Sequence, residues 1–518
     1  MKFKSILISM LAVAALASCS KEEAGTTTPD TPDMKGAKAF LSVSIKLPKV
    51  AGTYAGAPGP DHGTADEMAI NKVLVIGFDA SNNKVGVYEL TTAQQGTIGS
   101  NGTPAAHGDA FQVSDELAKI FVVINPTANF LTKINGAANY AAMNQAITED
   151  VGYMTDKVIA PATTSTGFMM TSAGAAVGDL GLTAVTPSIA TSESATDINA
   201  AKTLAETSPA GVNVDRTMAK IAVTKDAGFA VTNGTGSIDG WLPTATNKNY
   251  LPYAELALGY GGQGKYREDA NFAASTMADL DWIKNPTTTT TPLTWAGFTD
   301  MKYVHENTME AATQAYGNTT KVIVSASFFP TGVTTGDSWF RVGGVIKTFS
   351  QLDADYTAAK AATPQNTDLM NGYVAFLDKV LGTGRTKGWT SETGKTPVAL
   401  SDIEAEGDLA AYKASTANPH MIEFFYQGHC YYTVDINHDE DLPAFSLGRW
   451  GVVRNNSYKI NVKSISKPGL PFIPDPTDPD IKDPINPKPT DPSDEQSAFI
   501  SVEITVNPWT TWSQDVDL

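Results

Sequence analysis

Few residues of this 518-residue sequence have the types and spacing that catalysis requires. His429 and Cys430 could supply an imidazole base and a thiol nucleophile, but adjacent residues of a strand point to opposite faces, so a buried structural cysteine is expected. The sequence has no Gly-x-Ser-x-Gly, phosphate-loop, His-Glu-x-x-His or Cys-x-x-Cys motif, and its six histidines are scattered. It therefore predicts neither an enzyme nor a cofactor.

One acidic segment has the alternating spacing of a calcium-binding loop. The segment departs from that pattern at its sixth position, Glu440, where the loop requires glycine, and at its twelfth, Ser446, where the loop requires glutamate. A solvated loop is the interpretation, and no metal site is predicted. The oxygen-bearing residues are Asp435, Asn437, Asp439 and Asp441.

Cys19 is the residue whose surroundings indicate a covalent modification. Residues 1–18 combine two lysines, an apolar run and small residues, which is the pattern of a secretory signal peptide too short to span a bilayer. Leu16-Ala17-Ser18-Cys19 resembles a bacterial lipobox, in which the signal is cut before the cysteine and the thiol receives a lipid. Acyl chains contribute about 0.8 kcal/mol per buried methylene, so they would anchor the precursor in a membrane.

The residues after Cys19 indicate export to the cell surface. Ser20-Lys21-Glu22-Glu23 is similar to the export signal of surface lipoproteins in Bacteroidota, and residues 20–36 have the composition of a flexible tether. The formal net charge of the chain is −18, which argues against nucleic acid or an anionic membrane surface as a partner. Membrane contact is expected only through the lipid of the precursor.

The body of the chain is predicted to be all-β, with two β-sandwich domains. Short alternating or β-branched apolar runs are separated by Gly, Asn, Thr and Pro clusters, and one or two helices are expected, the first of them over 138–149. A segment poor in large apolar residues near 186–208 divides an N-terminal domain, 50–208, from a C-terminal domain, 209–467. The predicted strands cover 40–47, 72–78, 84–90, 120–124, 167–171, 218–224, 321–328, 422–426 and 431–434.

An unusual segment follows these domains. Residues 468–492 contain nine of the chain's 29 prolines, interleaved with aspartates, and proline cannot donate a hydrogen bond within a sheet. The roughly 25 residues of this stretch could extend as a polyproline II arm of about 75 Å at about 3.1 Å per residue, and the whole arm is expected over 468–497. Only residues 498–518 follow it, which is enough for one strand and a tail.

That last strand resembles a strand near the other end of the chain. Residues 498–507 read Ala-Phe-Ile-Ser-Val-Glu-Ile-Thr-Val-Asn, and residues 39–48 read Ala-Phe-Leu-Ser-Val-Ser-Ile-Lys-Leu-Pro. Because alternate side chains share a face, both strands can fill the same groove, and strand addition would supply main-chain hydrogen bonds and side-chain pockets. The apolar residues concerned are Phe40, Leu41, Val43, Ile45 and Leu47 in the first strand and Phe499, Ile500, Val502, Ile504 and Val506 in the second.

The chain resembles the type V pilus fimbrillins of Bacteroidales, and most closely the shaft subunit of the short (minor) fimbriae. The resemblance covers most of the chain and depends mainly on 451–458 (Gly-Val-Val-Arg-Asn-Asn-Ser-Tyr), the Pro/Asp segment, 499–509 and the terminal Val-Asp-Leu. Residues 168–171 and the segment around Arg216 support it, whereas residues 230–420 match loosely.

The resemblance implies a lipoprotein precursor, folded as two transthyretin-like β-sandwich domains, whose first strand is removed by a surface protease. The C-terminal donor strand of another copy then fills the groove, giving a head-to-tail filament that does not close on itself. The implied partners are further copies of the chain, anchor and tip fimbrial subunits, the processing protease, and host or bacterial surface ligands. Adhesion and biofilm formation are the implied functions.

The cleavage position departs from the family pattern. The family's protease is arginine-specific in its best-known members, but this chain has no arginine before Arg216. Lys49 occupies the place after the first strand, so cleavage between Lys49 and Val50 is expected, and Lys46 is disfavoured because it lies within the strand. Residues 19–49 would then form a lipidated propeptide.

Two alternatives stay open at this point. A surface-anchored glycan-binding lipoprotein would keep its lipid, but it leaves the Pro/Asp segment and the similar strands unexplained. A tip adhesin of the same pilus system is the other alternative, whereas a lipid-retained anchor subunit should lack a free donor strand.

Overall fold

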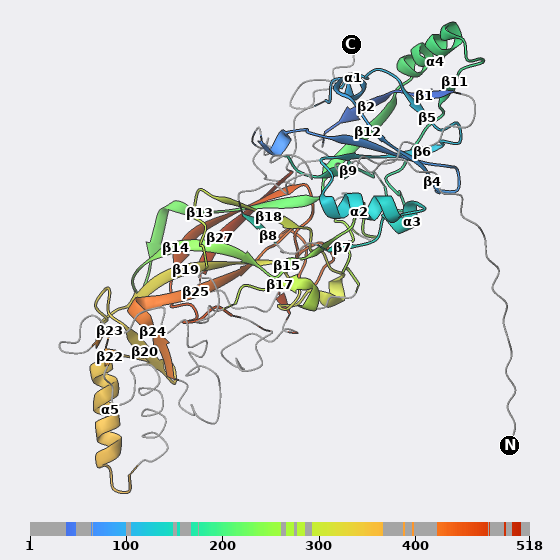
Figure 1. Cartoon of the computed structure of the whole chain (residues 1–518). Coiled ribbons are helices and arrows are strands. Elements are labelled where there is room, and N and C mark those ends of the chain that lie inside the picture. Colours follow the sequence, from blue (N-terminus) through green and yellow to red (C-terminus); the bar gives the residue numbers. More distant parts are fainter. Residues whose placement is uncertain are drawn as a thin grey trace, which may run out of the picture.

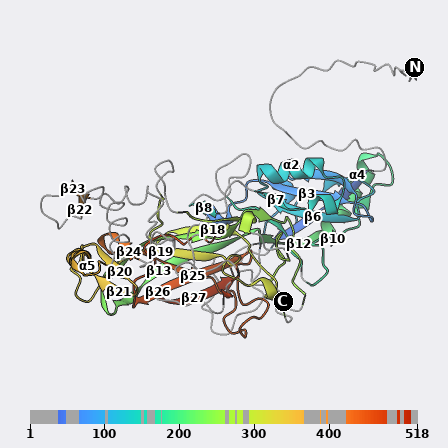
Figure 2. The same ribbon diagram turned by 90° about the horizontal axis from the view of Figure 1, so that it is seen from below.

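The structure is a computed structural model in which β-strands predominate, and this confirms the predicted all-β class. The chain forms an elongated body of two β-rich halves, and Figure 2 shows the same arrangement from a perpendicular direction. The described residues are 38–47, 64, 66–99, 105–148, 153–155, 167–174, 176–258, 260, 266–273, 277–284, 293–365, 387–388, 396–397, 422–474, 476, 490, 492–493 and 500–508.

The N-terminal half is a sandwich of two sheets. The larger sheet has the order β2-β12-β9-β6-β3-β4, with β10 also paired to β6, and the smaller sheet has the order β11-β1-β5. The strands are β1 (Ala39–Leu41), β2 (Val43–Lys46), β3 (Val73–Phe78), β4 (Lys84–Glu89), β5 (Phe111–Val113), β6 (Lys119–Ile124), β9 (Met170–Ser172), β10 (Thr183–Ala184), β11 (Ser188–Ile189) and β12 (Ala210–Arg216).

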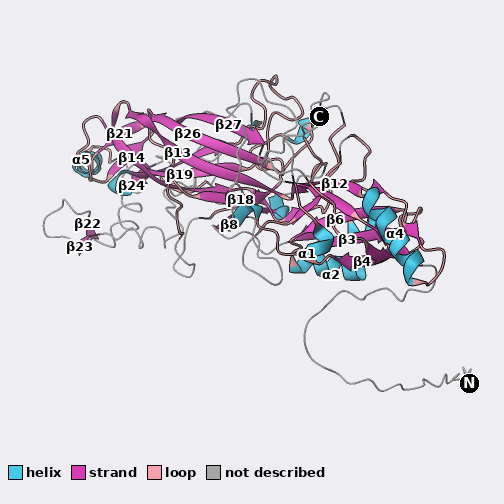
Figure 3. Cartoon of the chain, turned by 90° about the horizontal axis from the view of Figure 1, so that it is seen from above, coloured by secondary structure: helices cyan, strands magenta, loops and turns pink. Residues whose placement is uncertain are grey.

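Alternate side chains of the large sheet face two different apolar layers. Val73 and Val75 face the core between the sheets, whereas Ile76 and Phe78 face α2 and α3 on the other side of the large sheet. Figure 3 shows the helices of this half on the outside of its strands. The helices are α1 (Thr92–Gln95), α2 (Ala128–Gly136), α3 (Tyr140–Met143) and α4 (Ala195–Thr207).

The C-terminal half is a second sandwich. One sheet has the order β27-β26-β13-β18-β8, the other has the order β14-β19-β25, and a core that includes Trp241, Val324 and Ile460 lies between them. The strands are β8 (Tyr153–Thr155), β13 (Met218–Val231), β14 (Gly234–Thr244), β18 (Met301–His305), β19 (Lys321–Pro330), β25 (His429–Asp435), β26 (Asn456–Ile465) and β27 (Ile500–Pro508).

The end of the molecule farthest from the N-terminal half holds α5 (Phe349–Ala361) and a small sheet of β20 (Trp339–Val342), β21 (Val345–Lys347) and β24 (Ile422–Phe425) (Figure 1). No helix among the described residues is long and apolar enough to cross a membrane. The remaining short elements are β7 (Ile147–Thr148), β15 (Thr246–Asn247), β16 (Asn249–Tyr250), β17 (Leu280–Asp281), β22 (Lys387–Gly388), β23 (Thr396–Pro397) and the 3₁₀ turns Asp66–Met68, Met277–Asp279, Ala311–Thr313 and Tyr426–Gly428.

Two local predictions were wrong. The helix expected over 138–149 is only α3, because the chain turns after Met143 and Ile147 joins β7, which pairs with β16. The strand expected over 167–171 begins at Met170, because Gly167 has a φ of +106° that interrupts the extended backbone. Helices α2, α4 and α5 were not predicted from the sequence.

The passage between the halves differs in detail from the expected division at residue 208. Segment 186–208 contains β11 and α4, and the following strand β12 pairs with β2 and β9 in the N-terminal half. The chain enters the second sandwich only after Arg216, at β13. In addition, β8 lies before this passage in sequence but pairs with β18 of the C-terminal half.

The described parts of the Pro/Asp segment lie on the C-terminal half and are not extended away from it. Leu470 forms a bridge with Tyr431, and Phe472 and Ile473 are buried. Farther along, Pro492 forms a bridge with Ala315, and Ser493 is buried. These contacts bring the chain back to the same half before β27 begins.

Candidate strand-exchange site

The first described strand segment, 38–47, crosses between the two sheets of the N-terminal sandwich. Its first part, β1, lies between β5 and β11 in the small sheet, and both pairings are antiparallel. Its second part, β2, runs parallel to β12 in the large sheet. On the other side of β2, Gly99 accepts a hydrogen bond from the N–H of Leu47 at 2.9 Å and donates one to the carbonyl of Ile45 at 2.9 Å. The segment therefore has backbone partners on both sides.

The side chains of this segment complete the core of the N-terminal half. Val43 and Ile45 have no exposed surface, and Leu41 and Leu47 are at most 4% exposed. Their neighbours in the core come from β3, β5, β6 and β12. Removal of the segment would leave β5, β11 and β12 without a backbone partner along one side and would open the apolar core to water.

The side chains of Phe40 and Ser42, on the other face of this segment, each have specific contacts. The ring of Phe40 packs against the alanine face of α4, formed by Ala201 and Ala205, and the Lys202 ammonium lies 5.5 Å from the ring centroid. Ser42 lies where β1 ends and the chain turns toward β2, and its buried hydroxyl donates a 2.8 Å hydrogen bond to the carbonyl of Gly108. We call the site that residues 38–47 occupy in the N-terminal half the seat of this strand. It holds an aromatic ring and a small hydroxyl group two residues apart.

The last described strand, β27, is held much less completely. It pairs antiparallel with β26 at the edge of its sheet, from Ile465 opposite Ile500 to Asn456 opposite Pro508. Figure 3 shows β27 beside β26 on one side of the C-terminal half. Val502 and Ile504 pack against the core but stay partly exposed, and Glu503 forms an exposed ion pair with Lys463.

The described parts of the two similar strands thus occupy unequal seats. The first has partners on both sides and its apolar side chains are buried, whereas β27 has a partner on one side and partly exposed apolar side chains. Cys19, Lys49, Val50 and Phe499 lie outside the described residues.

A buried polar cluster joins the two halves. Glu67, from the 3₁₀ turn Asp66–Met68 of the N-terminal half, forms an ion pair with Lys220 of β13 at 3.2 Å and accepts a 2.7 Å hydrogen bond from the hydroxyl of Tyr303 in β18. Arg216 donates to the backbone carbonyl of Glu67 at 3.4 Å. The turn Asp66–Met68 is thus fixed to the C-terminal half, a feature that the sequence does not signal.

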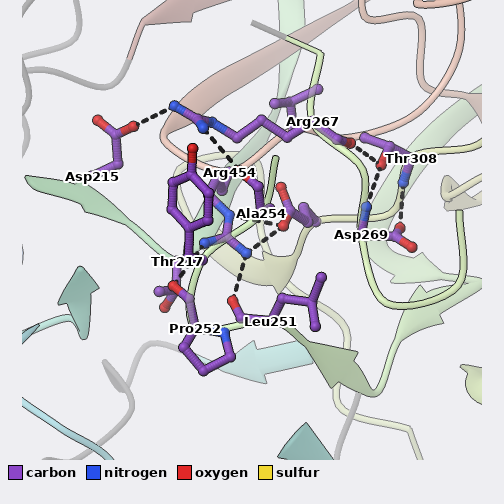
Figure 4. A network of polar contacts seen from close by, with 12 residues as sticks. Asp215, Thr217, Leu251, Pro252, Ala254, Arg267, Asp269, Thr308 and Arg454 are labelled. Atoms are coloured by element: carbon purple, nitrogen blue, oxygen red, sulfur yellow. Dashed lines mark hydrogen bonds and ion pairs between the residues drawn. The ribbon is translucent and has the colours of Figure 1, made fainter. Parts of the chain in front are cut away.

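Arg454 lies at the centre of a second network, seen from close by in Figure 4. Its guanidinium forms a buried ion pair with Glu306 and donates to the carbonyls of Leu251 at 2.8 Å and Pro252 at 3.3 Å. Next to it, Arg267 pairs with Asp215 at 2.9 Å. Arg454 thus braces the chain at Leu251 and Pro252 within the C-terminal half.

Burial shifts the pKa values of two titratable groups in these surroundings. Burial, followed by the charge of Glu306, raises the pKa of Asp269 to about 8, although the N–H of Thr308 donates to its carboxyl group at 2.5 Å. Burial, followed by the charge of Arg454, lowers the pKa of His305 to about 3. Both shifts favour the neutral form of the group.

The residues weighed for catalysis or metal binding have structural partners. Cys430 is buried, and burial raises the pKa of its thiol to about 12, so the expectation of a structural cysteine is confirmed. Asp435 pairs with the buried Lys321 at 2.9 Å, whereas Asp439 accepts a hydrogen bond from Tyr260 at 3.1 Å. No group of three metal-ligating side chains is present in the part of the chain that the structure describes.

Comparison with known proteins identifies the C-terminal region. Residues 423–515 match the family model described as "Major fimbrial subunit protein type IV, Fimbrillin, C-terminal". The matched segment includes β25, β26 and β27. The C-terminal region is thus similar to that of fimbrillins, in agreement with the fimbrillin resemblance inferred from the sequence.

Solved structures with overall similarity are distant. A proposed cell adhesion protein from Parabacteroides distasonis has 14% identity and a TM-score of 0.41, with 92% of this chain and 99% of that chain covered. The C-terminally truncated tip fimbrial protein Mfa3 from Porphyromonas gingivalis has 12% identity and a TM-score of 0.34, with 91% and 100% covered. No curated protein matches the sequence.

Proposed function

We propose that this protein is a structural subunit of surface fimbriae that polymerises by exchange of its terminal strands. The observation that carries the proposal is the seat of residues 38–47, which buries every apolar side chain of this strand and which a strand of similar sequence at the other end of the chain can fill. The fimbrillin match over 423–515 supports the fimbrial role.

In this proposal the chain is exported as a lipoprotein with its lipid on Cys19. A protease cuts between Lys49 and Val50 and releases residues 19–49, so that the seat becomes empty. The donor residues Phe499, Ile500, Val502, Ile504 and Val506 of another copy then replace Phe40, Leu41, Val43, Ile45 and Leu47. The product is an open head-to-tail filament that serves adhesion, with this chain as the shaft subunit.

The unequal burial of the two strands supplies a reason for the exchange. In its own half, β27 leaves Val502 and Ile504 partly exposed, whereas the corresponding positions Val43 and Ile45 are fully buried. Full burial of such a side chain contributes about 1.5 to 3 kcal/mol relative to exposure, so a move into the empty seat is favourable. Backbone hydrogen bonds on both sides of the strand add to this gain.

Paired substitutions at the cleavage position test the proposal. Lys49→Ala should leave full-length precursor at the cell surface and abolish filaments, because the seat stays occupied. Lys46→Ala is the matched control and should assemble normally, since Lys46 lies within β2 and is paired to Asn213. Filaments from the Lys49→Ala variant that begin at Val50, as in the unchanged protein, would contradict a lysine-directed cut.

A further inference from the structure

The seat of residues 38–47 differs from position to position in the side chain that it can hold. Val43 and Ile45 point into the core, whereas Ser44 and Lys46 between them are partly exposed. The preceding positions hold Phe40 against α4 and Ser42 against Gly108. A strand that replaces this segment must therefore match it in register as well as in alternation.

We infer that the C-terminal strand of a second copy of this chain enters the seat in one register, with Phe499 at the place of Phe40 and Ser501 at the place of Ser42. The inference rests on the proposed function and specifies its register. It also makes the pocket beneath α4 the site that recognises the incoming strand through the ring of Phe499. The remaining pairs are Ala498 for Ala39, Ile500 for Leu41, Val502 for Val43, Ile504 for Ile45 and Val506 for Leu47.

The seat has room for the one charged residue of the donor. In this register Glu503 takes the place of the partly exposed Ser44, whose partner on β12 is Gly211. A Cβ added at Gly211 would meet no atom within 4 Å, so the space above this glycine is open. The carboxylate of Glu503 can therefore reach water while its strand neighbours enter the core.

A donor register shifted by one residue is excluded by the charge of Glu503. It would place Glu503 at the position of Val43 or of Ile45, and both are completely enclosed by apolar side chains. A buried carboxylate without a partner is strongly unfavourable. Apolar residues of the donor would at the same time face water.

Shifts by two residues keep the alternation but fail at other positions. In one direction Glu503 would face the carbonyl of Gly108, and Pro508, which has no N–H, would replace the donor to Gly99 at Leu47. In the other direction Phe499 would replace the enclosed Ser42, and a serine would enter the pocket of Phe40. Only the unshifted register satisfies every position.

Disulfide trapping between two copies tests this register. One copy carries Asn213→Cys and the other carries Thr505→Cys, and both are produced in the same cells. Lys46 is the partner of Asn213 on β12, and Thr505 takes the place of Lys46, so the two thiols should meet across neighbouring subunits. Copies with Glu503→Cys or Asn507→Cys report the two shifted registers.

Sheared filaments are oxidised mildly and examined on a non-reducing gel. We expect a crosslinked dimer from the Thr505→Cys pair at least tenfold more abundant than from either shifted pair. Cys430 should not interfere because it is buried. A copy with Thr505→Cys and no Asn213→Cys partner is the background control.

The other outcomes separate the register from the proposed function. Filaments whose dominant crosslink involves Glu503→Cys or Asn507→Cys would overturn the register but leave strand exchange intact. Filaments without any of these crosslinks would overturn β12 as the seat. A crosslinked monomer from one chain that carries both substitutions would overturn a second copy as the occupant. Donor-strand assembly itself is tested separately with chains that end at Asp494. These chains should form no filaments, whereas the full-length cysteine variants should still form them.

Discussion

His305 shows how a single buried group couples the fold to pH. Its ring stacks on Tyr250 at 4.7 Å, and neither ring nitrogen has a hydrogen-bond partner among the described residues. Its pKa is lowered to about 3, against 6.5 in an unfolded chain. As the pH falls below 6.5 the unfolded chain binds the proton and the folded chain does not, so this group lowers stability.

His305→Phe should remove this contribution and keep the ring stacking. From pH 7.5 to pH 5 we expect His305 to account for about 2 kcal/mol of lost unfolding free energy, and the variant should lose less by that amount. Urea unfolding at both pH values measures it. The difference between the variant and the unchanged chain at each pH isolates this contribution. Identical pH profiles for His305→Phe and the unchanged chain would refute the prediction.

The Glu67 cluster is the second feature at this scale. Lys220→Met would leave the carboxylate of Glu67 buried without its cation, which typically costs 3 to 5 kcal/mol, so we expect a loss of about that size in unfolding free energy. Lys463→Met breaks the exposed pair with Glu503 and should hardly change the melting temperature. Equal melting temperatures for the two variants would show that the cluster does not stabilise the contact between the halves.

At the scale of elements, the strands with strong apolar alternation could be predicted from sequence. The segment 40–47 appears as β1 and β2, and the strand at 321–328 makes up most of β19, from its first residue on. The similarity of the two terminal strands could also be read from the sequence, but their different burial could not, because it depends on partners distant along the chain.

The missed elements have a physical explanation. Helix α4 buries only the small side chains of Ala201 and Ala205 against the sheet, so it lacks the stripe of large apolar residues that indicates a helix. The pocket for Phe40 therefore could not be foreseen. Glu67 could not be identified either, since a lone glutamate in a polar segment carries no sign that Lys220 and Tyr303 enclose it.

The unequal seats predict opposite effects of removing each strand. A chain that starts at Val50 should expose apolar surface, bind a hydrophobic dye and melt at a lower temperature, because its core has lost Leu41, Val43 and Ile45. A synthetic peptide of residues 498–508 should restore the melting temperature. Failure of the peptide to stabilise the shortened chain would count against the shared groove.

A chain that ends at Asp494 loses only an edge strand, so its melting temperature should change little.

In the whole molecule, the strand segment 38–47 and β27 lie in different halves of an elongated body (Figure 1). The seat of 38–47 is in the N-terminal half, whereas β27 lies on the C-terminal half. A contact between the C-terminal strand of one copy and the N-terminal half of the next is heterologous, so repetition gives a filament and not a closed dimer. The precursor prevents this contact because its own strand occupies the seat.

The N-terminal sequence of the protein in sheared surface filaments tests this account most directly, alongside the same preparation from cells whose copy ends at Asp494. The account predicts that the filament protein starts at Val50 and that the truncated copy forms no filaments. A surface protein that still starts at a lipid-bearing Cys19, with the truncated copy displayed at the same level, would contradict polymerisation by strand exchange.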